Sequence, residues 1–193
     1  MSRLITTLGV ASALLLSPAA LAQSAVQFPE ALDAGGYNRV RADAGAVIIA
    51  GQPDEAAFEA LPAQGVTTVI NLRTPQEMSS RVPFDEEAKA AELGLNYSTI
   101  PLGGDDYPYT PDAVDALAAI LADADGDVLL HCASARRASY LWAAYLVSYQ
   151  GMDVEQATSH AEAINFGPPQ PMLQMIAATP ADATDDAGAV ADD

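Results

Sequence analysis

The stretch Val128-Leu129-Leu130-His131-Cys132-Ala133-Ser134-Ala135-Arg136-Arg137-Ala138-Ser139-Tyr140-Leu141-Trp142 decides the fold. An apolar run typical of a buried strand ends at His131 and Cys132, a short loop follows, and a helical pattern begins near Arg136. A strand that passes through a short loop into a helix predicts an open α/β sheet, in which sites lie at the carboxyl ends of the strands. The sequence therefore places Cys132 at that edge, facing the start of a helix.

Strand and helix patterns alternate on both sides of this stretch. Further strands are predicted at 47–49, 66–72 and 95–100. Helices are predicted at about 54–64, 84–93, 110–122, 136–149, 154–164 and 170–178. The alternation predicts an α/β fold: a single domain centred on a parallel sheet and flanked by helices.

The two ends of the chain differ in composition from the middle. Residues 1–22 hold one basic residue, an apolar stretch and a small-residue site, which predicts a signal peptide and a periplasmic or secreted mature protein. That stretch is shorter than the roughly 20 residues of a membrane span, so no stable membrane insertion of the mature chain is expected. Residues 23–45 are predicted to be an irregular lead-in, 46–178 the domain, and 179–193 a disordered acidic tail.

The charge of the chain restricts its partners. There are 26 acidic residues against 8 Lys and Arg, which gives a formal net charge of −18. Nucleic acids and anionic membrane surfaces are bound by basic patches, so neither is an expected partner. No group of His, Cys and carboxylate residues has the spacing of metal ligands, and the sequence predicts neither a metal nor another cofactor.

Cys132 is the only cysteine, so an internal disulfide is ruled out and the thiol is either buried filler or a reactive group. At the start of a helix it would face backbone N–H groups and the positive end of the helix dipole, which favour the nucleophilic thiolate. The same N–H groups, together with the Arg137 guanidinium, can hold a tetrahedral anion above the sulfur. The residues expected to line this anion site are Ala133, Ser134, Ala135, Arg136 and Arg137.

This strand-His-Cys-loop-Arg-helix element resembles the signature loop of protein tyrosine and dual-specificity phosphatases. A closer resemblance, over about residues 47–167, is to the bacterial phosphatase-like family related to the phosphatase domain of beta-lactamase-hydrolase-like proteins. The shared motifs are Gly51-Gln52-Pro53, Val69-Ile70-Asn71-Leu72-Arg73 with Glu77, Ile100-Pro101 and His131-Cys132-x-Ser134-x-x-Arg137. The resemblance implies a tyrosine-phosphatase-like fold and a cysteine-dependent hydrolase of phosphomonoesters, acting on a phosphorylated protein or small molecule.

The resemblance also implies roles for single residues. Cys132 would form a phosphocysteine intermediate and Arg137 would bind the phosphoryl group. Asp105 or Asp106, in the loop after the predicted strand 95–100, would protonate the leaving oxygen, and we expect Asp105 to do so.

Three further residues are implied to support the site rather than to react. His131 would order the loop through hydrogen bonds. Ser139 would assist departure of the thiolate or cap the helix. Arg73 would form a structural pair with Glu77.

Two departures from the family pattern leave alternatives open. Arg137 is the fifth residue after the cysteine, whereas the main tyrosine phosphatases have Arg at the sixth, occupied here by Ala138. The shorter loop also resembles that of rhodanese-type sulfurtransferases, in which Cys132 would carry a persulfide. Ala135 stands where the family has Gly, and a Cβ at positive φ costs about 1–2 kcal/mol. A catalytically weakened, anion-binding pseudophosphatase is therefore the third interpretation.

Overall fold

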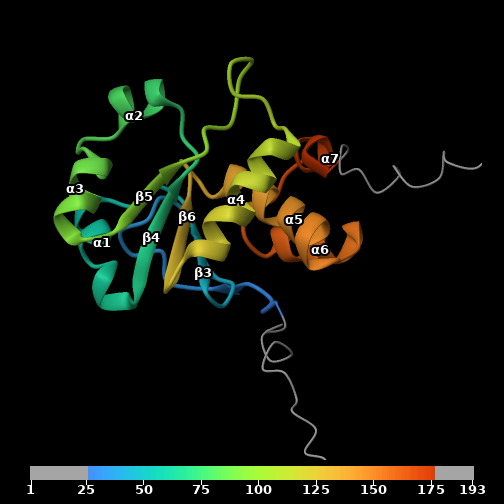
Figure 1. Cartoon of the computed structure of the whole chain (residues 1–193), viewed down its shortest axis with the longest axis horizontal. Helices are drawn as coiled ribbons and strands as arrows, with labels where there is room; N and C mark the ends of the chain where they lie inside the picture. The colour runs from blue at the N-terminus through green and yellow to red at the C-terminus, as the bar shows by residue number, and fades with distance from the viewer. Residues whose placement is uncertain (1–25, 177–193) are drawn as a thin grey trace, which may run out of the picture.

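A mixed sheet of six strands runs through residues 26–176, the part of the chain that the computed structural model describes (Figure 1). Its order is β1-β2-β3-β6-β4-β5. The strands β3, β6, β4 and β5 pair in parallel, which confirms the predicted α/β fold centred on parallel strands. The bounds are β1 Glu30–Ala31, β2 Arg41–Asp43, β3 Val47–Ala50, β4 Val66–Asn71, β5 Asn96–Thr99 and β6 Asp127–His131.

The segment 23–45 was predicted to be irregular, and for its described part this is wrong. It contains β1 and β2, which pair antiparallel and extend the sheet beyond β3. A tight turn joins β2 to β3, with Gly45 at φ 89° and its N–H donating to the Asp43 carboxylate at 2.7 Å. Strands of two and three residues are too short to show a period in the sequence. The predicted signal peptide and acidic tail lie outside the described residues.

The helices follow the predicted order, with one addition. Their bounds are α1 Glu55–Glu59, the 3₁₀ turn η2 Pro62–Gln64, α2 Pro75–Arg81, α3 Glu86–Leu93, α4 Pro111–Asp123, α5 Arg136–Gln150, α6 Val154–Glu162 and α7 Gln170–Ile176. Helix α2 was not predicted, although Thr74 and Glu77 form a capping box around Pro75 at its first turn. The predicted helix 54–64 is interrupted, because Pro62 has no N–H to continue the hydrogen-bond ladder.

Each face of the sheet packs against its own set of helices (Figure 1). Alternate residues of a strand point to opposite faces, so Ile49 and Leu130 pack into one core, with α4, α5, α6 and α7. Ile48 and Leu129, their neighbours, pack into the other core, with α1 and α3. The predicted covering of both faces by helices is therefore confirmed.

Strand β6 and helix α5 position the candidate site. β6 lies between β3 and β4, and its residues from Val128 onward are buried. The chain leaves β6 at its carboxyl end and enters α5 after four intervening residues, so this loop lies at the edge where the neighbouring parallel strands also end. Gly51, directly after β3, lies between this loop and Asn38: a Cβ there would be 3.3 Å from the Cα of Ser134 and 1.8 Å from the Asn38 carbonyl oxygen.

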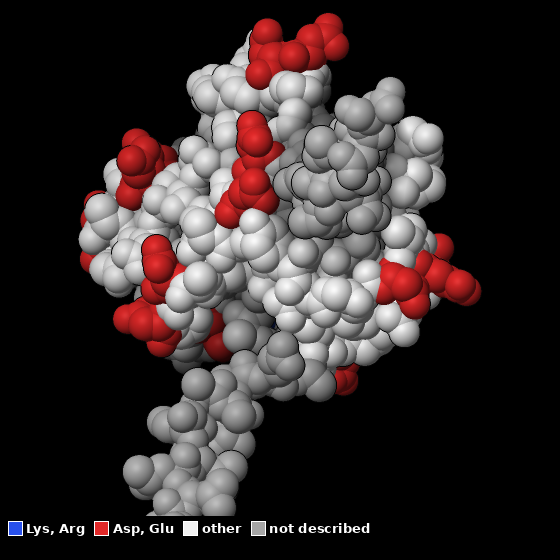
Figure 2. All heavy atoms as spheres, turned by 45° about the vertical axis from the view of Figure 1, so that its right-hand side comes forward, with Lys and Arg blue, Asp and Glu red and all other residues white. Residues whose placement is uncertain are grey.

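The surface of the described domain carries much negative charge. On the face shown in Figure 2 several separate groups of Asp and Glu are visible, and no Lys or Arg. Among the helices of residues 26–176, none combines the length and the apolar character that crossing a membrane requires. An anion site on this protein must therefore be built from a few local cations.

Candidate active site

The loop between β6 and α5 holds Cys132 at the bottom of the site. Its side chain is only 1% exposed, so a reactant would reach the sulfur only from the side on which the loop opens. Ala135, the residue before α5, has φ 64° and ψ −5°, the left-handed conformation considered above. A left-handed residue next to a helix start brings successive N–H groups toward one point, which forms a concave binding site for anions.

Hydrogen bonds fix the outer side of this loop. The Ala133 carbonyl accepts from the Asn38 side chain at 2.7 Å and from the Gln52 N–H at 3.3 Å. The N–H of the same trans peptide belongs to Ser134 and points to the opposite side, the inside of the loop. The Ser134 carbonyl in turn accepts from the Asn165 side chain at 2.6 Å. The first N–H groups of α5 have no acceptor within the helix and can join the same site.

Arg137, on the first turn of α5, is held by three segments of the chain. Its Nη1 and Nη2 donate to the two carboxylate oxygens of Glu77 at 2.7 and 2.8 Å. Nη1 also donates to the Leu102 carbonyl at 2.7 Å. Burial alone would lower the pKa of Arg137, but its hydrogen bonds to Glu77, the charge of Glu77 and the nearby Cys132 more than offset this effect, and the pKa is raised. The guanidinium therefore lies within interaction distance of the Cys132 thiol.

Glu77 pairs chiefly with Arg137, and it also forms the longer ion pair with Arg73 that the sequence predicted. The Nε of Arg73 is 3.9 Å from the Glu77 carboxylate, a much longer contact than the bidentate one with Arg137. Burial raises the pKa of Glu77, but the hydrogen bond from Arg137, the Thr74 N–H and the two guanidinium charges lower it to about 2. Glu77 is therefore ionised at neutral pH and fixes the orientation of Arg137.

Arg73 is 5% exposed and belongs to a second network, which passes through Gln52. Its Nη1 donates to the Gln52 side-chain oxygen at 2.7 Å. The Gln52 side-chain nitrogen donates to the carboxylate of Glu86, a residue that is 1% exposed. The Tyr97 hydroxyl donates to the other oxygen of Glu86 at 2.8 Å.

His131 meets the same buried carboxylate. Its Nε2 lies 3.3 Å from Oε2 of Glu86, and both side chains are completely enclosed. Burial alone would raise the pKa of Glu86, but His131 and the hydrogen bonds from Gln52 and Tyr97 more than offset this, and the pKa is lowered. The residue before Cys132 is thus tied through Glu86 to the Gly51-Gln52-Pro53 motif.

Aromatic side chains form another wall near the thiol. Tyr109 and Tyr140 meet edge to face with centroids 6.1 Å apart, and Tyr140 meets Phe166 at 5.1 Å. Burial is the main reason that the pKa of Tyr109 is raised, and the nearby charges include Arg137, which lowers it, and Cys132, which raises it. Tyr109 therefore lies within electrostatic reach of both.

Arg136 is exposed, and a Cβ on Gly167 would lie 3.4 Å from its Nη1. This places Arg136 beside Gly167, on a different side from the Arg137–Glu77 pair.

Ser139 is buried, and its hydroxyl donates to the Arg136 carbonyl at 2.8 Å. That hydrogen bond lies within α5 and does not cap the helix.

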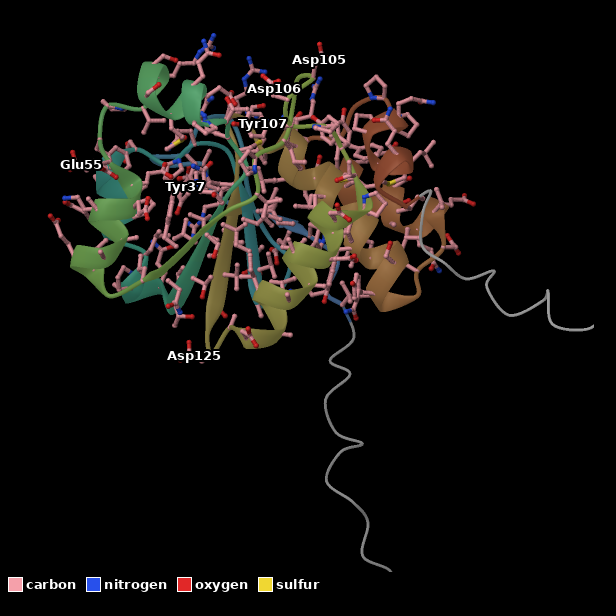
Figure 3. All side chains as sticks on the ribbon, turned by 45° about the horizontal axis from the view of Figure 1, so that its top comes forward. Tyr37, Glu55, Asp105, Asp106, Tyr107 and Asp125 are labelled. Atoms are coloured by element: carbon pink, nitrogen blue, oxygen red, sulfur yellow. The ribbon has the colours of Figure 1, made fainter. Side chains whose placement is uncertain are left out.

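Asp105 and Asp106 are exposed in the loop that follows β5. Figure 3 shows Asp105 at the tip of this loop, with its carboxylate directed outward. The base of the loop contacts the site: the Leu102 carbonyl accepts from Arg137, and a Cβ on Gly103 would lie 3.6 Å from Nη1 of Arg137. The base of the loop thus borders the anion site, whereas both carboxylates are exposed to solvent.

A cavity of about 480 Å³ adjoins the second network, between α2, α3 and β5. Its lining includes Asn71, Arg73 and Glu86, with Met78 and Phe84 among the apolar residues. Within residues 26–176 no group of three or more His, Cys, Asp and Glu residues is arranged to hold a metal ion.

Sequence reasoning missed several residues that shape the site. Gln52 lay within a quoted motif, but nothing in the motif revealed its contacts. Glu86 follows Asp85, the cap of α3, and had the pattern of an ordinary acidic first turn. Asn38, Tyr109 and Asn165 stand in segments without a distinctive pattern.

Three features define the class of cysteine-dependent, tyrosine-phosphatase-like proteins, and this chain has them all. They are a thiol at the end of a central parallel strand, a short loop after it, and an Arg on the first turn of the following helix. The sequence profile described as "Beta-lactamase hydrolase-like protein, phosphatase-like domain" matches residues 40–148. Because this match spans more than half of the chain, the chain belongs to that phosphatase-like family, as its motifs predicted.

Individual relatives agree with this family. A beta-lactamase hydrolase-like protein of Xylella fastidiosa (strain Temecula1 / ATCC 700964) is 33% identical over 122 residues, which are 62% of this chain and 28% of that protein. The chain thus spans about a quarter of the length of this relative. Among solved structures, a Shewanella putrefaciens CN-32 protein provisionally described as a phosphatase (DUF442) has a TM-score of 0.57 at 26% identity, covering 75% of this chain and 95% of that one.

More distant structures share the fold. TpbA of P. aeruginosa, solved in complex with pTyr, has a TM-score of 0.53 at 18% identity. The superposition covers 72% of this chain and 80% of TpbA. At that identity the likeness shows the fold alone.

Replacing Ala135 by Gly should stabilise the protein. The change removes a Cβ at positive φ, which costs about 1–2 kcal/mol, against about 0.4–1 kcal/mol for the greater freedom of Gly in the unfolded chain. We expect a net gain of about 0.5–1 kcal/mol in the free energy of unfolding, measured by chemical denaturation. Ala119→Gly, at an exposed position inside α4, is the matched control and should lose about 1 kcal/mol. Loss of stability in Ala135→Gly would contradict the backbone assignment.

Glu77 should make stability depend on acid pH. The pKa of Glu77 is about 2 in the folded protein and about 4.5 in an unstrained chain, so the unfolded chain takes up the proton first as the pH falls. Its contribution is fully present above pH 4.5 and shrinks as the pH falls toward 2. The gap in free energy of unfolding between the natural protein and Glu77→Gln should therefore narrow from about pH 7 to about pH 3. Glu30→Gln, on the exposed strand β1, is the control; a gap independent of pH would refute the prediction.

Proposed function

We propose that this chain is an exported, cysteine-dependent phosphomonoester hydrolase. The observation that carries the proposal is the contact between Cys132 and Arg137 across the loop that joins β6 to α5, with Arg137 oriented by Glu77. Family membership supports the same conclusion, because the family is described as phosphatase-like. The export proposal rests on the composition of residues 1–22 and places the mature protein in the periplasm or outside the cell.

In the proposed reaction the Cys132 thiolate attacks phosphorus, and the bond from phosphorus to the leaving oxygen breaks. Asp105 or Asp106 gives its proton to that oxygen. Water then attacks the phosphocysteine, its proton passes to the same carboxylate, and the sulfur–phosphorus bond breaks to restore the thiolate. The Ser134 N–H, the first N–H groups of α5 and Arg137 stabilise the phosphoryl oxygens in both steps.

The loop that carries Asp105 is open in this structure, because the carboxylate is directed outward (Figure 3). Catalytic hydrogen bonds are often absent until a substrate binds, so this geometry is compatible with a role in proton transfer. Gly103 and Gly104 both have positive φ, and they provide a backbone that can move the loop tip relative to its base.

The proposed substrate is a phosphomonoester on a protein or a small molecule. Two features support an aryl ester. Tyr109, Tyr140 and Phe166 form an aromatic wall near the thiol, and such rings pack well against a planar leaving group. TpbA, which shares the fold, was solved with pTyr.

Cys132→Ser is the decisive variant for the phosphatase proposal. Ser lacks a nucleophile of comparable strength, but the N–H groups and Arg137 that bind the anion are unchanged. We expect turnover of an aryl phosphate to fall below detection, while inorganic phosphate still binds with an affinity within about threefold of the natural protein. Steady-state kinetics and calorimetric titration measure the two properties. Turnover that survives in this variant would exclude Cys132 as the nucleophile.

A sulfurtransferase is the second candidate, because the loop has Arg at the fifth position after Cys132. In that reaction the thiolate attacks the outer sulfur of thiosulfate, sulfite leaves, and the resulting persulfide passes this sulfur to cyanide, which gives thiocyanate and restores the thiolate. Parallel assays of the natural protein with thiosulfate plus cyanide and with an aryl phosphate separate the two activities. Turnover of thiosulfate alone would replace the phosphatase proposal.

The residue that acts as general acid can be identified by comparing substrates whose leaving groups differ in their need for a proton. Loss of an acid should slow hydrolysis of an alkyl phosphate about 10²–10⁴-fold, because an alkoxide must be protonated as it leaves. An aryl phosphate with an acidic phenol should be affected much less. We expect this selective loss in Asp105→Asn, with Asp106→Asn as the neighbouring control, measured as kcat. The reverse result would assign the role to Asp106. If both variants hydrolysed the alkyl phosphate as fast as the natural protein does, this loop would be removed from the mechanism.

A further inference from the structure

The loop that joins β6 to α5 has unpaired N–H groups and bound carbonyl groups in the same peptide units. Among residues 26–176, no backbone carbonyl accepts a hydrogen bond from the N–H of Ala133, Ser134 or Ala135. The carbonyls of Ala133 and Ser134, in contrast, are both engaged. Nδ2 of Asn38 donates to the first at 2.7 Å, and Nδ2 of Asn165 donates to the second at 2.6 Å. Two consecutive peptide units are therefore held by their oxygens and leave their N–H groups available.

Each of these two hydrogen bonds fixes the direction of an N–H group. The carbonyl and the N–H of a trans peptide point in opposite directions, because the atoms of the unit lie in one plane. The Ala133 carbonyl shares its unit with the N–H of Ser134, so Asn38 sets the direction of that N–H. The Ser134 carbonyl shares its unit with the N–H of Ala135, which Asn165 directs in the same way.

The loop needs such support because of Ala135. A residue other than Gly at φ 64° is strained, and strain of this kind persists only where the surrounding structure holds the backbone. A rotation of the peptide unit before Ala135 would relieve the strain, but it would turn the N–H away from the anion and the Ser134 carbonyl toward it. A backbone dipole stabilises an oxyanion only when its N–H end is directed at the charge. Asn165 opposes the rotation, because the rotation would break its hydrogen bond.

Other contacts hold the two asparagines in place. The N–H of Asn38 donates to the Gln52 carbonyl at 2.9 Å. Asn165 precedes Phe166, whose ring meets that of Tyr140 on α5 edge to face with centroids 5.1 Å apart. Asn38 lies before β2, and Asn165 lies in the turn after α6. The loop is therefore supported by two segments that are far apart in the sequence and are each anchored to the domain.

We propose that Asn38 and Asn165 are positioning residues for the reaction. Without contacting the substrate, they aim the N–H groups of Ser134 and Ala135 at the phosphoryl oxygens. Both asparagines lie outside residues 40–148, the part of the chain that the family profile matches, so segments beyond that part complete the anion site. This inference rests on the proposed function, since it assumes that the phosphoryl group binds inside the loop.

The test is calorimetric titration of the full chain with inorganic phosphate, which gives the Kd and the fraction of binding-competent molecules separately. Asn38→Ala and Asn165→Ala each remove one hydrogen bond, and the released peptide unit can then turn its N–H away from the anion. We expect each substitution to raise the Kd about three- to tenfold, as the loss of one neutral hydrogen bond does, with the competent fraction unchanged. With an aryl phosphate, kcat/KM should fall by at least the same factor, because the same N–H groups stabilise the transition state.

Gln150→Ala is the matched control. It removes an exposed amide that donates to the Tyr145 hydroxyl at 2.8 Å, at the opposite end of α5 from the loop. Because this site is remote from the loop, the Kd for phosphate should stay within about twofold of that of the natural protein.

A merely structural role of the asparagines would give a different result: the competent fraction or the melting temperature would fall while the Kd stayed unchanged. That result in both asparagine variants, or equal weakening in Gln150→Ala, would overturn the inference. If one asparagine variant does not fold, the other alone carries the test. Failure of the natural protein to bind phosphate and to hydrolyse the aryl phosphate would instead refute the proposed function.

Discussion

The bidentate pair between Arg137 and Glu77 is the interaction on which the candidate site depends. It joins the first turn of α5 to α2, and the Leu102 carbonyl adds the loop after β5. A half-buried guanidinium without such partners would be unfavourable, and a flexible one would not present a fixed face to an anion. The pair thus converts a long, mobile side chain into a rigid part of the loop that surrounds Cys132.

Several ionisable side chains near this pair are buried in the protein. Arg73, Glu86 and His131 are all nearly or completely buried, and each contacts another polar group behind the loop. Removing one partner from such a network leaves another group unsatisfied, so the effects of substitutions should not add. The arrangement gives the loop two layers: the backbone and Arg137 face the anion, and the buried network supports them from behind.

The sequence predicted the parts of this structure that local patterns determine. The apolar run ending at His131 indicated β6, and the spacing from Cys132 to Arg137 indicated the loop and the start of α5. The positive φ considered for Ala135 is found at the residue that precedes α5. Glu86 shows where such reasoning ends: an acid on the first turn of a helix is normally exposed, and only the tertiary packing of Gln52, Tyr97 and His131 encloses it.

The acidic surface has a consequence for the speed of encounter. A phosphate dianion that diffuses in from bulk solution first experiences the repulsion of a chain with net charge −18, and only near the loop the attraction of its arginines. Dissolved ions limit electrostatic forces to about 8 Å at physiological ionic strength, so they suppress the distant repulsion more than the short-range attraction. Association with anionic ligands should therefore become faster as ionic strength rises, the opposite of the behaviour of enzymes with basic clefts.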